Sequence, residues 1–225
     1  MIFKPNTGKQ MLLSIAAAAL FAASGAASAL TISNVSDSDG SSAYFDITLN
    51  TATTVGDITT IDLGIDAVNG FKAEAPAAGP PALPFDSAFD TVQLTITADP
   101  GTQLVSLDFI ESLMVTTGAT GYAQINGSVA VAGGGTKGFN ALYLPNTGAT
   151  FDTASISPDF VFAPGTTEIV VTVSNSLFAI NDASIEKTSA SLVVETAPIP
   201  LPIPLALLGS GLLGFVLVGR RNRQA

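Results

Sequence analysis

Alternating apolar and polar residues dominate the middle of the chain. In Asp90–Thr97, Val92, Leu94 and Ile96 lie on one face and polar residues on the other. A period of two with one polar face is typical of antiparallel sheet. The same pattern, or enrichment in Thr and Val, predicts further short strands at Leu30–Val35, Ala43–Leu49, Ile58–Ile65, Leu104–Ile110, Gly121–Ile125, Ser128–Ala132, Phe139–Leu144, Glu168–Ser174 and Ser184–Glu195. We therefore expect an all-β fold, an antiparallel β-sandwich of jelly-roll or Ig-like type.

Turn signals separate these predicted strands. Asn126-Gly127, between two strand-like runs, is a strong hairpin signal. Asp99-Pro100-Gly101 and Ala163-Pro164-Gly165 each precede a strand and predict turns. The proline-rich segment Lys72–Phe85 predicts a long surface loop, because too few residues precede it to form a core of their own. Gly133–Gly135 predicts a flexible connection.

The amino-terminal 29 residues have the three parts of a secretory signal peptide. Lys4 and Lys9 supply positive charge, and Met11–Ala23 is almost wholly apolar. Ala27 and Ala29 are the small residues that signal peptidase requires before its cut. We expect export and cleavage after Ala29, which leaves residues 30–196 as the folded domain. An uncut membrane anchor is the alternative, although the apolar run is shorter than the ~20 residues of a usual span.

Residues 197–225 also fall into three parts. Prolines recur at alternate positions from Pro198 to Pro204 and favour an extended backbone. Leu205–Gly219 has no charge and no proline, and with the residues before it could just cross a bilayer. A basic cluster follows at Arg220, Arg221 and Arg223. Such a cluster stays on the cytoplasmic side of a span, so the domain would lie outside the cytoplasm.

This tail resembles the PEP-CTERM class of exosortase sorting signals. Ile199-Pro200-Leu201-Pro202-Ile203 is similar to the Val-Pro-Leu-Pro-Ala motif of the VPLPA type. The resemblance implies a protein held briefly in the inner membrane and processed there by an exosortase. It also implies delivery to the cell surface or to an exopolysaccharide matrix. A plain single-span anchor that is never cut is the alternative.

Composition narrows the chemistry that the domain can perform. The chain has no His and no Cys, which excludes Cys/His zinc sites, thiol nucleophiles and a Ser-His-Asp triad. Residues 30–196 contain all 18 acidic residues and only three basic ones, Lys72, Lys137 and Lys187. A surface of that sign repels nucleic acid and attracts divalent cations. We expect a protein that is not an enzyme and needs no cofactor, with calcium as a possible ligand.

Two groups of carboxylates are candidates for a site. Asp37 and Asp39 alternate as the ligands of a calcium loop do, but a polar turn explains them equally well. The neighbouring acids Asp108 and Glu111, like Asp62 and Asp66, have a spacing compatible with paired glycosidase carboxylates. In so acidic a chain we expect these pairs to be solvated surface.

Two functions remain for such a domain. A structural role at the cell surface or in the biofilm matrix is our first expectation. The alternative is a calcium- or glycan-binding β-sandwich module in the same place, with exopolysaccharide as its partner. Sugar sites favour exposed aromatic residues, and this domain has no Trp and three Tyr residues, Tyr44, Tyr122 and Tyr143.

Overall fold

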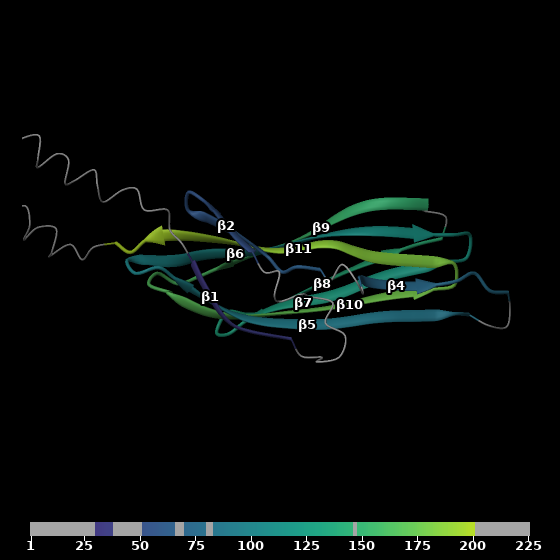
Figure 1. Cartoon of the computed structure of the whole chain (residues 1–225), viewed down its shortest axis with the longest axis horizontal. Helices are drawn as coiled ribbons and strands as arrows, with labels where there is room; N and C mark the ends of the chain where they lie inside the picture. The colour runs from purple at the N-terminus through teal and green to yellow at the C-terminus, as the bar shows by residue number, and fades with distance from the viewer. Residues whose placement is uncertain (1–29, 38–50, 66–69, 80–82, 146–147, 201–225) are drawn as a thin grey trace, which may run out of the picture.

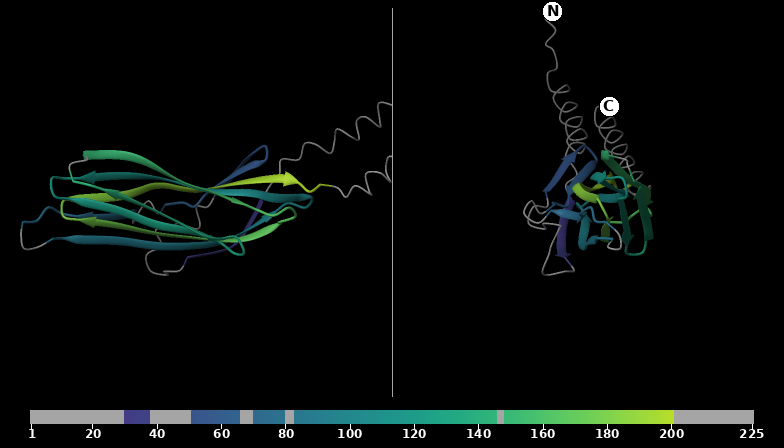
Figure 2. Two further views of the ribbon diagram at one scale, coloured as in Figure 1. Left: turned by 180° about the vertical axis from the view of Figure 1, so that it is seen from behind. Right: turned by 90° about the vertical axis from the view of Figure 1, so that its right-hand side faces the viewer.

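The computed structural model describes residues 30–37, 51–65, 70–79, 83–145 and 148–200. Within these residues the chain forms two antiparallel sheets that pack face to face as a β-sandwich (Figure 1). The same two layers are seen from behind and end-on in Figure 2, and the buried apolar side chains of the described residues form one cluster. The predicted all-β antiparallel sandwich is confirmed. The narrower jelly-roll or Ig-like assignment stays a prediction.

The first sheet, sheet A, contains five strands, and the second, sheet B, contains six. In spatial order, sheet A consists of β1 (Leu30–Asp37), β5 (Phe85–Ala98), β10 (Glu168–Ile180), β7 (Tyr122–Val131) and β8 (Gly135–Tyr143). Sheet B consists of β2 (Thr51–Val55), β3 (Ile58–Asp62), β11 (Ala183–Pro198), β6 (Thr102–Thr117) and β9 (Gly148–Val161), and β4 (Phe71–Ala75) also pairs with β11. In Figure 1, β6, β9 and β11 form the upper layer and β5, β7 and β10 the lower one.

Alternation along the long strands builds the core. On β10, Val171, Val173 and Leu177 have no exposed surface, while Thr172, Ser174 and Ser176, which point the other way, are partly exposed. The facing strand β11 buries Ile185 and Leu192 in the same way. Each such side chain contributes roughly 1.5–3 kcal/mol when it leaves water. The apolar face predicted from the sequence is thus the face that joins the two sheets.

Both proline-glycine turns occur where the sequence predicts them. The amide of Thr102 donates to the carbonyl of Asp99 at 3.0 Å, and Gly101 has a φ of 90°. The amide of Thr166 donates to the carbonyl of Ala163 at 3.1 Å, and Gly165 has a φ of 87°. Glycine adopts these positive φ values without steric cost, which is why it ends each turn.

The hairpin predicted at Asn126-Gly127 is wrong. Strand β7 continues through both residues, and Gly127 pairs with Asn175 on one side and Phe139 on the other. A Cβ at Gly127 would lie 2.1 Å from Cζ of Phe139, so glycine is needed there for close packing rather than for a turn. The chain reverses instead at residues 132–134, where a flexible connection was expected.

The predicted loop Lys72–Phe85 is wrong at both ends. Lys72 to Ala75 belong to strand β4, which pairs with β11, and Phe85 begins β5. Strands β2 and β9 were not predicted. The predicted strand Ala43–Leu49 lies outside the described residues. At the other end of the domain, β11 extends to Pro198, which pairs with Thr102.

Candidate functional site

A shallow groove of about 240 Å³ lies along the central strands of sheet A. We call it the Phe89 groove. Its lining residues come from β5, β7 and β10 and are Phe89, Asn126, Gly127, Ser128, Ser174, Asn175 and Ser176. None of these side chains titrates near neutral pH. The groove can therefore bind a neutral ligand, but it holds no group for acid–base catalysis.

Strand register sets the groove's chemistry. Phe89 pairs with Ser176, and Ser176 pairs with Asn126 on the next strand. Two residues before Ser176 on β10, Ser174 pairs with Ser128 on β7. Because these positions point away from the core, hydroxyl and amide groups form a continuous strip beside the Phe89 ring, which is 53% exposed.

Further aromatic residues continue this face toward one end of the sheet. The rings of Phe85 and Phe178 stack with centroids 6.0 Å apart, and Phe85 is exposed. Tyr122 pairs with Ile180 at the end of the same face, and both are partly exposed. Exposed apolar rings beside polar groups are a usual composition for a binding surface.

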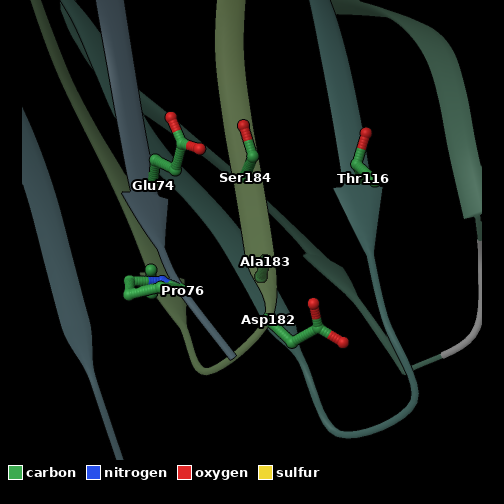
Figure 3. A pocket seen from close by; sticks show the side chains of 7 residues that line it. Glu74, Pro76, Thr116, Asp182, Ala183 and Ser184 are labelled. Carbon is green, nitrogen blue, oxygen red and sulfur yellow. The ribbon is translucent and has the colours of Figure 1, made fainter. Parts of the chain in front are cut away.

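A second pocket, of about 200 Å³, lies where strands β4, β6 and β11 meet at one end of sheet B. It is lined by Glu74, Ala75, Pro76, Thr116, Asp182, Ala183 and Ser184. Figure 3 places the carboxylates of Glu74 and Asp182 at opposite ends of this pocket. Glu74 forms an ion pair with Lys72 at 2.5 Å, and this hydrogen bond raises the pKa of Lys72.

The Asp182 end of that pocket is built by a tight turn. Asn181 and Asp182 both have positive φ, and together they join β10 to β11. The Asn181 side chain accepts from the amide of Ala78 at 3.0 Å and donates to Thr120 Oγ1 at 2.8 Å. Its buried side chain thus ties the turn to two neighbouring loops, which indicates a structural role.

Among the described residues, four of the buried polar side chains lie together in the core, where no site is predicted from the sequence. Asp90 and Asn175 come from sheet A, and Glu111 and Lys187 from sheet B; all four are buried. Lys187 Nζ lies 2.5 Å from Glu111 Oε2. The expectation that Glu111 is solvated surface is therefore wrong. We call these residues the buried polar layer.

Burial lowers the pKa of Lys187 below its ordinary value of 10.5, although the Glu111 and Asp90 carboxylates act in the opposite direction. The ring of Phe71 lies 4.9 Å from Nζ, and the ring of Phe109 lies 5.8 Å away. A sequence signal for this layer does exist. Glu111 stands between Phe109 and Leu113 in a period-two apolar run, and Asn175 interrupts a similar run.

No family model matches the chain, and no curated protein matches it. Among solved structures, the sandwich is similar to TmCBM61, which was solved in complex with β-1,4-galactotriose. The match has 10% sequence identity and a TM-score of 0.23, and it covers 72% of this chain and 90% of that one.

The calcium candidates remain predictions. Asp37 is the last residue of β1, where its backbone pairs with Val92, and Asp39 lies outside the described residues. In the described part of the chain, no three acidic side chains gather closely enough to hold a metal ion. Of the carboxylate pairs, Asp62 is exposed as expected, and its Oδ1 accepts from the amide of Gly64.

The predicted signal-peptide and sorting segments lie mostly outside the described residues. This applies to Ala27, Ala29, the span 205–219 and the arginine cluster. Ile199 and Pro200 are described, and the Ile199 amide donates to the carbonyl of Gly101 at 2.9 Å. The predicted sorting motif therefore begins directly after the last residue of β11. Across the described ranges, the chain has no helix of the length and hydrophobicity that crossing a membrane requires.

Proposed function

We propose that this chain is an exported, non-catalytic β-sandwich protein that binds polysaccharide at the cell surface or in the extracellular matrix. The amino-terminal signal pattern supports export. The tail from Ile199 to the arginine cluster supports processing by an exosortase in the inner membrane. Because this class of sorting signal is associated with exopolysaccharide, a glycan is a ligand that the mature protein would meet.

The Phe89 groove is the observation that carries the binding proposal. Sugar rings present an apolar face and a rim of hydroxyl groups, so they suit an exposed aromatic ring beside short polar side chains. Phe89 provides the ring, and Asn126, Ser128 and Ser174 provide amide and hydroxyl groups. The open strip along the strands also suits an extended chain better than a small molecule.

The test compares binding of exopolysaccharide by three forms of the exported protein in affinity gel electrophoresis. Phe89→Ala removes the exposed ring and should weaken binding at least about fivefold, equivalent to roughly 1 kcal/mol. Met114→Ala is the matched control, because Met114 is similarly exposed at 46% but lies on sheet B. Equal retardation of all three forms would refute the site, and no retardation of any form would refute binding.

A structural role without a ligand is the second candidate, and one observation favours it. Polar groups of the outer face of sheet A already bond to one another. Thr91 Oγ1 donates to Ser174 Oγ at 3.0 Å, and Gln124 Nε2 donates to Asn126 Oδ1 at 3.1 Å. Such mutual bonding is also what a solvated sheet face displays. Loss of matrix cohesion on deletion of the protein, with no polysaccharide binding in the gel, would favour this role.

A further inference from the structure

The buried polar layer brings an amine, a carboxamide and a carboxyl group together in the core. The strand register of each sheet brings these residues to the same level of the sandwich. Asn175 pairs with Asp90 within sheet A, while in sheet B Ala190 pairs with Glu111. An irregularity of β11 between Lys187 and Ser189 shifts the register there. Both Thr188 and Ser189 are exposed, and Lys187 keeps its inward direction.

One carboxylate oxygen joins the amine to the amide. Glu111 Oε2 accepts from Lys187 Nζ at 2.5 Å and from Asn175 Nδ2 at 3.1 Å. The two nitrogens are therefore neighbours, although they belong to opposite sheets. The other oxygens of these two side chains, Glu111 Oε1 and Asn175 Oδ1, are buried and accept no hydrogen bond. Buried oxygens without a donor are costly in a finished core, so their presence requires a reason.

The surroundings favour reaction between these groups over a simple ion pair. Lys187 has no exposed surface. This burial disfavours the ammonium form and increases the share of neutral amine, which is the nucleophile, although the Glu111 carboxylate and the rings of Phe71 and Phe109 favour the ammonium. It also excludes water, which would otherwise compete for the amide carbon.

We propose that Lys187 and Asn175 form an intramolecular isopeptide bond, with Glu111 as the group that moves the protons. The Glu111 carboxylate takes one proton from the Lys187 ammonium group, and neutral Nζ then attacks Cγ of Asn175. A bond forms between Nζ and Cγ, and the bond between Cγ and Nδ2 breaks. Nδ2 leaves as ammonia with a second proton from Nζ, and the new amide keeps the third. No oxidant, reductant or co-reactant is needed.

The bond would link the two sheets through the core. Strand β10 belongs to sheet A and β11 to sheet B, and β11 leads directly into the sorting motif at Ile199. Tension applied at the carboxyl end could peel β11 from the sandwich only as far as the link at Lys187. A covalent link also removes conformations from the unfolded chain, which stabilises the fold. These effects hold whatever the Phe89 groove binds.

Peptide mapping of the denatured, purified exported protein tests the proposal. A protease that cuts after glutamate separates residues 169–186, which contain Asn175, from residues 187–195, which begin with Lys187. In the wild type we expect these two peptides to remain joined as one branched species, lighter than their sum by one ammonia. Two separate peptides of full mass from the folded protein would overturn the proposal.

Control measurements distinguish the isopeptide bond from other reactions that release ammonia or water. The two Asn-Gly pairs, Asn69-Gly70 and Asn126-Gly127, can lose ammonia by closing succinimides, but these do not join peptides. Lys187→Arg and Asn175→Ala should each give separate peptides, and Glu111→Gln should give mainly separate peptides because it cannot accept the proton. Joining of Lys187 to the Asp90 peptide, with loss of water, would overturn the assignment to Asn175. The wild-type map decides the matter even where a variant fails to fold.

Discussion

Lys187 Nζ lies 2.5 Å from Glu111 Oε2, and neither side chain has any exposed surface. Asp90, also fully buried, adds a second carboxylate whose field acts on Lys187. Before any bond to Asn175 forms, one cation thus serves two acids in the middle of the sandwich. Removal of one partner from a buried pair leaves an uncompensated charge, which is far more costly than loss of the pair's net attraction.

Because two buried acids share one lysine, removal of the lysine should reduce the free energy of unfolding more than removal of one acid does. In an Asn175→Ala chain, which cannot form the isopeptide bond, Lys187→Met leaves two buried carboxylates without a cation, so it should reduce the free energy of unfolding by about 3–5 kcal/mol. In the same chain, Glu111→Gln leaves Asp90 to balance the lysine and should cost about 1–3 kcal/mol. Urea unfolding of both variants measures the difference. A Glu111→Gln variant less stable than Lys187→Met would contradict the account of the layer.

Lys187 also predicts a pH dependence in a chain that cannot form the isopeptide bond. In Asn175→Ala, burial keeps the pKa of Lys187 below 10.5 in the folded state. Between that lowered pKa and 10.5 the unfolded chain binds more protons, so stability should rise with pH across this window. Glu111 and Asp90 are the charged groups of the layer that face Lys187 and limit the effect.

Thermal unfolding at a series of alkaline pH values checks this rise. The double variant Asn175→Ala/Lys187→Met is the control, because it lacks the titrating amine. Its stability should change less steeply over the same window. Identical slopes in the two variants would show that Lys187 does not titrate with a lowered pKa.

Gly127→Ala should destabilise the sandwich by about 1–3 kcal/mol, because the core is already filled at this point. The added Cβ would lie 2.1 Å from Cζ of Phe139 and 2.7 Å from Oδ1 of Asn175. Gly138→Ala is the matched control on the neighbouring strand, where the nearest atom, the carbonyl oxygen of Gly127, is 3.6 Å away. Its change should stay within about 0.5 kcal/mol. Equal midpoints for the two variants in urea would contradict the proposed role of Gly127.

The sequence predicts the sandwich well because alternation is a direct consequence of strand geometry. Val92, Leu94 and Ile96 face the core as their spacing requires, and the glycine at position 101 ends a turn as expected. Local patterns of this kind need no information from distant parts of the chain. For the same reason the short strand β4 was missed, since its pairing with β11 depends on a partner more than a hundred residues away.

Gly127 and Glu111 illustrate the limits of local patterns. An Asn-Gly pair favours a turn, yet here the glycine is required by the ring of Phe139, which comes from the next strand. Glu111 occupies a core position by its spacing, but an acid in an acidic chain suggests surface until its partner Lys187 is located. The Phe89 groove also depends on residues that are distant in the sequence, because Phe89, Asn126 and Ser174 become neighbours only through strand register.

The tail predicts that the mature protein lacks its carboxyl-terminal span. The glycines within Leu205–Gly219 lower helix propensity, and the stretch barely reaches bilayer length. Changing Pro200 and Pro202 together to alanine should block the cut and leave the protein in the inner membrane. Pro198→Ala is the control, because Pro198 ends β11 outside the five-residue motif.

Intact-mass analysis of protein from the envelope and the medium measures the outcome. We expect the wild type and the control to lack Arg220–Ala225, and the double proline variant to retain them. A wild-type chain that always keeps these residues, in cells that contain an exosortase, would refute the sorting proposal and leave an ordinary membrane anchor.

Backbone amide NMR during titration with oligosaccharides from the exopolysaccharide tests polysaccharide binding in the Phe89 groove. We expect saturable shifts at Phe89, at residues 126–128 and at residues 174–176, which belong to three adjacent strands. Amides of Thr116 and Ser184, on sheet B, should not move. No shifts at saturating oligosaccharide, or shifts confined to the pocket beside Asp182, would contradict it.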